Sequence, residues 1–141
     1  MKKMSKNKFK QTEIGEIPEG WSVVTLSDIA ELLDYKRVPL NSRVRDSRKG
    51  IYPYYGASGI VDHLDDYIFD GEYVLISEDG ENLRSRQTPI AFIAKDKFWV
   101  NNHAHIVLGK SDLMNQFIVY YFQNIDINPY ITDKMLILVE V

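Results

Sequence analysis

The stretch Pro89–Leu108, PIAFIAKDKFWVNNHAHIVL, holds the densest run of strand-forming residues in the chain and decides the fold. Ile90–Lys95 is a short, uninterrupted apolar run, which predicts a strand buried on both faces. The polar pair Asp96-Lys97 predicts a tight turn, and Phe98–Val100 predicts a second strand after it. Two strands and a turn therefore form the centre of the predicted structure.

A third strand is predicted directly after Asn101-Asn102, where side chains alternate with period two. One face of this strand carries Ala104, Ile106 and Leu108, which we expect to lie in the core. The other face carries His103, His105 and Val107, which we expect to offer polar groups.

Length and composition favour a single domain with one core, because the chain has 141 residues and 45% apolar content. The sequence has no cysteine, which excludes disulfides and thiolate metal sites. No apolar run approaches the length of a membrane span, and the lysines at the start are not followed by an apolar signal segment. We therefore expect a cytoplasmic protein that makes no membrane contact.

Charge is distributed unevenly along the chain. The formal net charge is −3, and taking away the five lysines of residues 1–11 leaves −8 for the rest. Within this acidic body, a basic cluster spans residues 36–49, whereas residues 62–81 hold eight acids and no lysine or arginine. Such segregation predicts a local basic surface on an acidic protein, and the alternative is a solvated loop with no partner.

The order of elements predicts an α+β fold, in which a compact body of many short strands has a short helix before it and a helix after it. The helices are predicted at Thr25–Leu33 and Leu113–Gln123 from their capping residues and apolar stripes. Ile51–Tyr55 is predicted as an edge strand because it contains Pro53. Long surface loops are predicted for residues 35–50 and 77–88.

We divide the chain into a disordered basic tail (1–11), one domain (12–132) and an aberrant tail (133–141). Ile14, Ile17 and Trp21 are expected to anchor the start of the domain by burying their side chains.

Three sequence patterns bear on possible catalysis. His103 and His105 share a strand face and could form two corners of a metal site, but no third ligand is placed beside them. Asp34-Tyr35-Lys36 is the only acid-x-lysine triplet for a metal-dependent nuclease. Asn128-Pro129-Tyr130 lacks the second proline of the base-holding element of amino methyltransferases. We expect no intrinsic catalysis, no metal and no cofactor.

Four segments, taken in order, carry a specific resemblance. They are Thr12–Trp21 (TEIGEIPEGW), Tyr54–Ile60 (YYGASGI), Asp70–Ile76 (DGEYVLI) and Trp99–Leu108 (WVNNHAHIVL). Together they resemble a target recognition domain of the specificity subunit of type I restriction-modification enzymes, over residues 12 to about 132.

The resemblance implies a role in reading double-stranded DNA. In this family two such domains each read one half of a bipartite target, and methyltransferase and restriction subunits supply the catalysis. A long helix of an antiparallel coiled coil follows the domain in the family. We expect that helix to be missing here, because residues 133–141 show no heptad pattern, and this expectation leaves assembly with the partner subunits open.

Charge and loop position give the candidate DNA contacts. The candidate phosphate contacts are Lys36, Arg37, Arg43, Arg45, Arg48 and Lys49. The candidate base readers are Arg84, Arg86 and Gln87. The alternative is a protein-interaction fragment that joins a methyltransferase complex without reading DNA specifically, and a metal-dependent nuclease ranks third.

Overall fold

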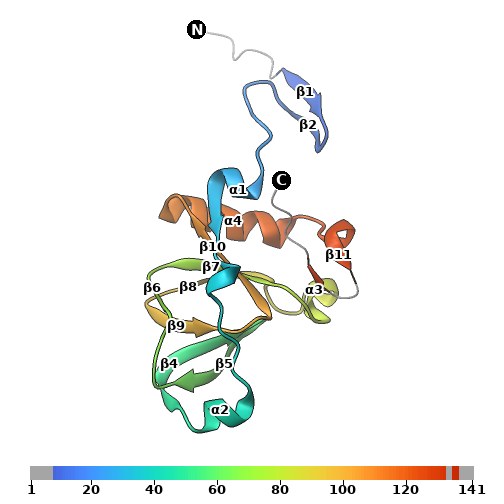
Figure 1. Ribbon diagram of the computed structural model, residues 1–141. Helices are drawn as coiled ribbons and strands as arrows, with labels where there is room; N and C mark the ends of the chain where they lie inside the picture. Colours follow the sequence, from blue (N-terminus) through green and yellow to red (C-terminus); the bar gives the residue numbers. More distant parts are fainter. Residues whose placement is uncertain (1–7, 133–134, 137–141) are drawn as a thin grey trace.

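Two four-stranded sheets and one long helix form the body of the protein (Figure 1). The computed structural model describes residues 8–132 and 135–136. The first sheet has the order β3-β10-β7-β8 and the second the order β5-β4-β9-β6. The strands of the first sheet are β3 (Ala30–Leu32), β7 (Tyr73–Ser77), β8 (Ala91–Ala94) and β10 (Ala104–Gly109). Those of the second are β4 (Lys49–Gly56), β5 (Gly59–Leu64), β6 (Phe69–Asp70) and β9 (Lys97–Val100).

Shorter elements connect and flank these sheets. The helices are α1 (Leu26–Ile29), α2 (Ser42–Asp46), α3 (Asn82–Ser85) and α4 (Asp112–Asn124), with 3-10 turns η1 (Asp34–Lys36) and η2 (Asn128–Tyr130). The hairpin β1 (Phe9–Thr12) and β2 (Gly15–Pro18) precedes α1, and β11 (Ile131–Thr132) pairs with β12 (Met135–Leu136). The predicted α+β class, with short strands in the middle and helices before and after, is confirmed.

The strand β10 separates two parts of the core. Ile106 belongs to the cluster between the two sheets, together with Leu75 and Phe98. Val107 belongs to the cluster between the first sheet and α4, together with Ile118. The prediction that one face of this strand is polar was therefore wrong, because α4 covers the face that carries Val107.

The second sheet contains one parallel pair, between β4 and β9. The expectation of an edge strand at Ile51–Tyr55 was wrong, since β4 lies between β5 and β9. Pairing with β9 begins at Tyr54, one residue after Pro53, so the proline lies outside that ladder. Tyr54, Leu64 and Trp99 form a third, small cluster in this part of the body.

Helix α1 is much shorter than predicted. The helix starts where the sequence predicts it, with Thr25 as the capping residue. The Asp28 carboxylate accepts a hydrogen bond from the Thr25 amide at 2.8 Å. The chain then leaves the helix at Ala30 and pairs with β10 through Val107–Gly109. The unpaired edge of β10 offers backbone donors and acceptors, and these override the helical pattern of residues 30–33.

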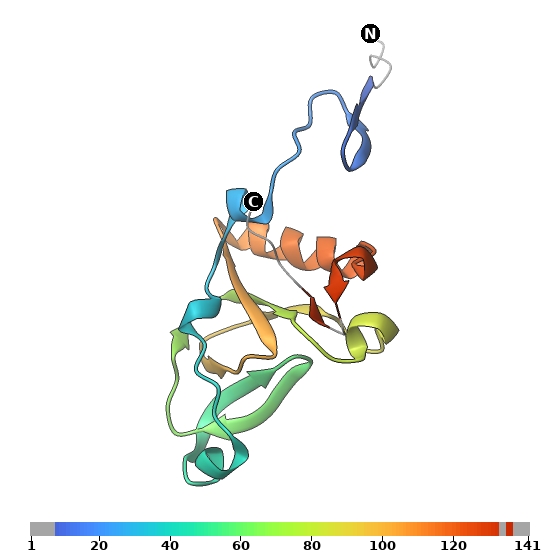
Figure 2. The same ribbon diagram turned by 45° about the vertical axis from the view of Figure 1, so that its right-hand side comes forward.

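The N-terminal hairpin stands away from the body (Figure 2). Phe9–Gln11 of the predicted disordered tail lie in β1, and residues 1–7 of that tail lie outside the described residues. The expected burial of Trp21 and Ile14 was wrong, since both are exposed, and only Ile17 is half-buried. The predicted aberrant tail also lies outside the described residues, except for the strand β12.

Helix α4 begins where β10 ends, and one contact fixes this junction. The buried Asn115 side chain accepts a hydrogen bond from the Gly109 amide at 2.7 Å. A Cβ at Gly109 would lie 2.7 Å from the Asn115 Oδ1 atom and 3.0 Å from its backbone nitrogen. The helix therefore approaches the strand closely enough to favour glycine at this position.

We predict that Gly109→Ala lowers the free energy of unfolding by about 1–3 kcal/mol, because the added methyl group displaces the buried Asn115 side chain that binds the residue 109 amide and crowds the backbone at Met114 and Asn115. Urea unfolding measures the change. Gly20→Ala is the matched control, since a Cβ there meets nothing within 4 Å. Equal stability of the two variants would contradict the close approach.

Candidate nucleic-acid interface

The basic segment of residues 36–49 folds into η1, α2 and the start of β4 instead of the predicted loop. Asn41 starts α2, since its side chain accepts a hydrogen bond from the Val44 amide at 2.9 Å. This local structure fixes the positions of all six candidate phosphate contacts.

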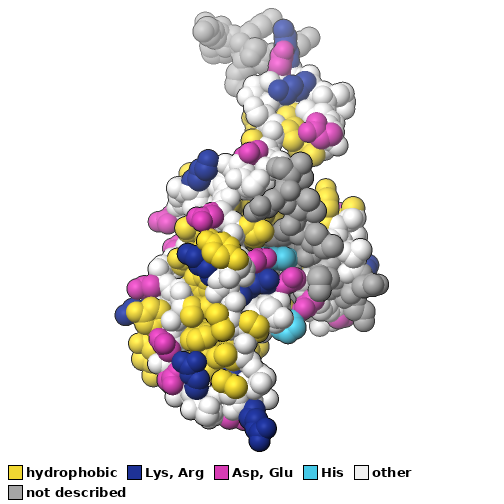
Figure 3. Space-filling view, viewed as in Figure 1, with side chains coloured by type: hydrophobic (Ala, Val, Ile, Leu, Met, Phe, Trp, Pro, Cys, Tyr) yellow, Lys and Arg dark blue, Asp and Glu magenta, His cyan; other side chains and the backbone are white. Residues whose placement is uncertain are grey.

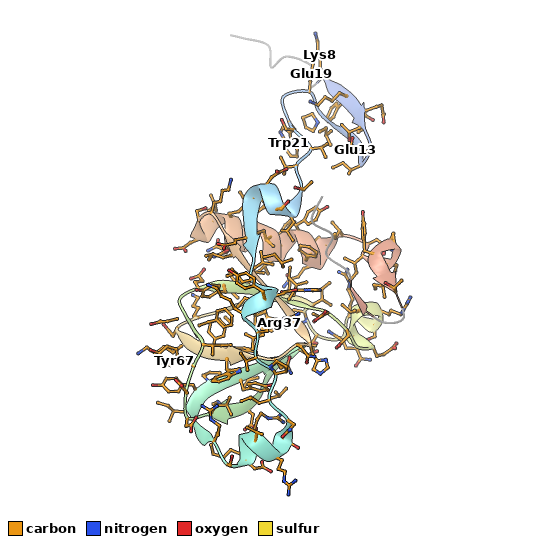
Figure 4. The ribbon with its side chains drawn as sticks, in the orientation of Figure 1. Lys8, Glu13, Glu19, Trp21, Arg37 and Tyr67 are labelled. Carbon is orange, nitrogen blue, oxygen red and sulfur yellow. The ribbon has the colours of Figure 1, made fainter. Side chains whose placement is uncertain are left out.

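Arg37 lies inside the body, where it links three segments of the chain (Figure 4). Its Nη1 atom donates to the Glu78 carboxylate at 2.6 Å and to the Ala104 carbonyl at 2.9 Å. Its Nε atom donates to the carbonyl of Asp34 at 3.1 Å. The side chain is only 15% exposed, so its charge acts within the fold.

Three further basic residues face the acids of β5 and the residue after it. Asp62 accepts from the Arg45 Nε atom at 2.9 Å and from the Lys49 Nζ atom at 2.7 Å. Arg48 lies 3.1 Å from Asp65. The hydrogen bonds from Lys49, Arg45 and the His63 amide hold the pKa of Asp62 far below its ordinary value. The antiparallel pairing of β4 and β5 thus brings the basic and acidic segments together and neutralises much of the predicted basic surface.

Lys36 and Arg43 differ from the other four candidate phosphate contacts in having no ionic partner among the described residues. Both side chains are exposed. On the face shown in Figure 3, basic side chains are scattered among acidic, apolar and uncharged ones and form no continuous basic patch.

The predicted loop of residues 77–88 contains α3. The three candidate base readers in it point to different surroundings. Arg84 and Gln87 are exposed. Arg86 instead turns to the C-terminus of α4, where it donates to the carbonyls of Gln123 at 2.9 Å and Ile125 at 2.7 Å. These carbonyls lack partners within the helix, and a cation there is favourable to the helix dipole. Sequence reasoning could not foresee this contact, because its partners lie 37 and 39 residues away.

A polar groove of about 470 Å³ lies between the segment before α2 and the turn that connects β9 with β10. Asn101 shapes the turn through two hydrogen bonds. Its side-chain oxygen accepts one from the His103 amide at 2.8 Å, and its own backbone amide donates one to the Tyr55 carbonyl at 3.0 Å. Asn102 and His103 are exposed at its surface. Arg45 lines the groove and stacks on Tyr54, with 5.1 Å between its guanidinium carbon and the ring centroid. Arg45 was among the candidate DNA contacts from the sequence. Asn101, Asn102 and His103 were not, although the Asn-Asn-His turn after a buried strand was a usable signal.

The two histidines of this region have separate partners. The His103 Nδ1 atom lies 2.7 Å from Asp79, whereas the buried His105 lies 2.6 Å from Asp34. Burial acts to raise the pKa of Asp34, but the hydrogen bonds from His105 and the Ile106 amide, with the charges of His105 and Arg37, outweigh it and leave the pKa lowered. Asp34 is thus a structural anchor. Among the described residues, no group of three metal-ligating side chains gathers at this or another place.

Comparison with known proteins decides the family. Residues 18–134 match the model of the type I restriction modification DNA specificity domain. The chain belongs to this family. The resemblance inferred from the four sequence segments is therefore confirmed.

The chain is also similar in sequence to individual specificity subunits. A putative type I restriction enzyme specificity subunit of Haemophilus influenzae is 39% identical over 109 residues, which cover 77% of this chain and 27% of the relative. The MjaIX specificity subunit of Methanocaldococcus jannaschii is 23% identical over 138 residues, covering 89% of this chain and 32% of the relative. The chain therefore spans about a quarter to a third of the length of these relatives.

The fold also has a counterpart among solved structures. The S subunit of a type I restriction-modification system from M. genitalium superposes with a TM-score of 0.54 at 16% identity, over 71% of this chain and 26% of that one. Among the described residues of our chain, no helix has the length and apolar character needed to cross a membrane.

We predict that Arg86→Ala lowers the free energy of unfolding by about 1.5–3 kcal/mol, because the carbonyls at the end of α4 lose a charged donor. Chemical denaturation measures this loss. Arg84→Ala, on the same short helix α3 but exposed, should change stability by less than about 0.5 kcal/mol. If both variants were equally stable, the capping role of Arg86 would be wrong.

Proposed function

We propose that this chain is a non-catalytic module that reads one half of a bipartite double-stranded DNA target. Membership of the DNA specificity domain family, over residues 18–134, is the observation that carries the proposal. Methyltransferase and restriction subunits would supply the catalysis, and a soluble complex in the cytoplasm would be the setting.

The arrangement of the loops supports this role. The groove beside Asn102 and His103 includes the polar side chains of Asn41 and Arg45, and the strands that flank its turn, β9 and β10, are largely buried. Exposed side chains on a rigid frame suit recognition, because little conformational entropy is lost when they contact a ligand. Lys36 and Arg43 lie on η1 and α2, in the segment that flanks the groove.

Roles are proposed for the individual candidates on the basis of their surroundings. Lys36 and Arg43 are the primary phosphate contacts, because their charges are not used by ion pairs with described residues. Arg45, Arg48 and Lys49 are secondary phosphate contacts, because their charges are already paired with acids of the fold. Arg45 and Lys49 pair with Asp62, and Arg48 pairs with Asp65. Arg84 and Gln87 are the base readers, since arginine pairs with guanine and glutamine with adenine in the major groove.

Arg37 and Arg86 receive a different role in this proposal. Each holds backbone carbonyls of the fold, so they position the DNA-contacting loops without touching DNA themselves. Arg37 joins η1 to the start of β10, and Arg86 joins α3 to the end of α4.

A second candidate role, association with a methyltransferase subunit without specific reading, is favoured by a separate observation. Helix α4 exposes several large apolar side chains, including Leu113 and Phe117. Exposed apolar patches mark contacts with other proteins.

We predict weak, salt-dependent binding of the isolated chain to duplex DNA, because the few available charges can neutralise only a few phosphates. Lys36→Glu and Arg43→Glu should each weaken binding to all sequences and lower the salt slope by about one. Fluorescence anisotropy at several salt concentrations measures both quantities. Lys95→Glu, an equal charge change on the turn between β8 and β9, is the control and should leave the slope nearly unchanged.

Base reading needs a second experiment, on a duplex selected from a randomised library with the methyltransferase subunit present. Arg84→Ala and Gln87→Ala should each cost about 1–3 kcal/mol on that duplex and little on unrelated DNA. Loss of affinity for every sequence alike would sink the assignment of α3 and its loop to base reading.

A further inference from the structure

His103 holds a fixed position at the surface of the polar groove, on the turn between β9 and β10. Its backbone amide donates to the Asn101 side chain at 2.8 Å, and its carbonyl accepts from the Glu78 amide at 3.0 Å. The ring is held as well, because its Nδ1 atom lies 2.7 Å from a carboxylate oxygen of Asp79. The side chain is nevertheless 53% exposed, so a ligand in the groove can reach it. A side chain held in this way loses little conformational entropy when it binds.

The contact with Asp79 decides which hydrogen-bonding group the ring of His103 presents to a ligand. A carboxylate accepts hydrogen bonds and does not donate them, so the hydrogen of the neutral ring lies on Nδ1. The opposite nitrogen, Nε2, then carries a lone pair and is an acceptor. Among the described residues it has no hydrogen-bond partner. The other two histidines differ, because His105 is buried against Asp34 and His63 lies on β5, outside the lining of the groove.

The charges around His103 are unfavourable to a phosphate group. Asp79 contacts the ring, and Glu81 is exposed in the same loop. The nearby guanidinium groups of Arg37 and Arg45 are already paired with acids of the fold. The carboxylate beside the ring repels a phosphate, whereas the amine of a base edge is an uncharged donor and meets no such repulsion. These surroundings favour contact with a base over contact with the DNA backbone.

The major groove of DNA offers such amines at two of the four bases. Adenine presents its N6 amine and cytosine its N4 amine, whereas guanine and thymine present carbonyl oxygens at the same edge. An acceptor such as the neutral Nε2 atom pairs with the first two bases and meets lone pairs on the other two. The ring therefore suits discrimination between bases that carry an amine and bases that carry a carbonyl.

We propose that His103 is a base-reading residue, whose Nε2 atom accepts a hydrogen bond from the exocyclic amine of an adenine or a cytosine in the major groove. Asp79 is the positioning residue, because it holds the ring and keeps the hydrogen on Nδ1. This inference rests on the DNA-reading role proposed above. It adds to that role a specific atom, a specific class of base and a dependence on the protonation state of the ring.

A double-mutant cycle between protein and DNA tests the contact, on the duplex selected from the randomised library with the methyltransferase subunit present. Each adenine and cytosine is replaced in turn by an analogue that lacks the exocyclic amine. At one position the wild-type chain should lose affinity about three- to tenfold, as expected for one hydrogen bond. His103→Ala should weaken binding of the selected duplex by a similar factor and remove the sensitivity to that position. His63→Ala is the matched control, an exposed histidine outside the groove, and should behave like the wild type.

Dependence on pH separates base reading from a purely structural role of the ring. Protonation turns Nε2 from an acceptor into a donor, and imidazoles titrate between about pH 5 and 8. The charged groups around His103 are the carboxylates of Asp79 and Glu78 and the guanidinium groups of Arg37 and Arg45, two classes that titrate well outside pH 6–8. Lowering the pH from 8 to 6 should therefore weaken wild-type binding at least about threefold more than binding of His103→Gln. The glutamine oxygen accepts a hydrogen bond at either pH, so this variant should keep its sensitivity to the missing amine.

Circular dichroism of each variant confirms that it is folded. The proposal is overturned, and the DNA-reading role still stands, if His103→Ala binds the selected duplex as tightly as the wild type or if no amine position couples to this residue. Binding that is stronger at pH 6 than at pH 8, and that needs the histidine for this difference, indicates a contact with phosphate or guanine and also overturns amine reading. If no duplex is selected from the library, both proposals are wrong.

Discussion

Burial of β10 on both faces is the constraint on which the rest of the structure depends. Ile106 packs toward the second sheet and Val107 toward α4, so both layers must be present for either side chain to leave water. The edge of the same strand pairs with β3, which ends helix α1 early and directs the chain toward η1. At the start of the strand, Arg37 and Asp34 bind its backbone, and they fix the entry turn that forms one wall of the polar groove.

Most of the charged side chains of the basic segment form ion pairs within the fold. The sequence separates a basic segment from an acidic one, and the β4–β5 pair brings them face to face, so that Asp62 accepts hydrogen bonds from both Arg45 and Lys49. Partly exposed pairs of this kind contribute little stability each, but they hold long side chains in fixed positions. The consequence for DNA contact is that the available positive charge is smaller than the sequence suggests. Specificity would then come from shape and from hydrogen bonds in loops that the fold holds rigidly, and less from a general electrostatic attraction.

The sequence predicted the parts of the fold whose signals are local. The strands around Phe98 and Ile106, the turn at Asp96 and the helix capped by Ser111 all follow from short patterns, and the structure confirms them. Predictions failed where a distant partner decides the outcome. The end of α1 is set by the edge of β10, and the position of Arg86 by carbonyls of α4. The candidate DNA contacts were chosen because they are charged, but the sequence does not tell whether a charged side chain faces solvent or forms an ion pair within the fold. The groove beside Asn102 forms only where α2 and the β9–β10 turn meet, so no local pattern predicts it.

We propose that the loops around this groove, together with α3 and the loop after it, form the DNA-reading face of the domain. The most direct measurement is the titration of isotopically labelled protein with duplex DNA, followed by the shifts of its backbone amide resonances. Our account predicts shifts at residues 36–45, 84–87 and 101–103, where η1, α2, the end of α3 and the β9–β10 turn lie. Shifts confined to α4 and the N-terminal hairpin, with the groove residues unchanged, would contradict it.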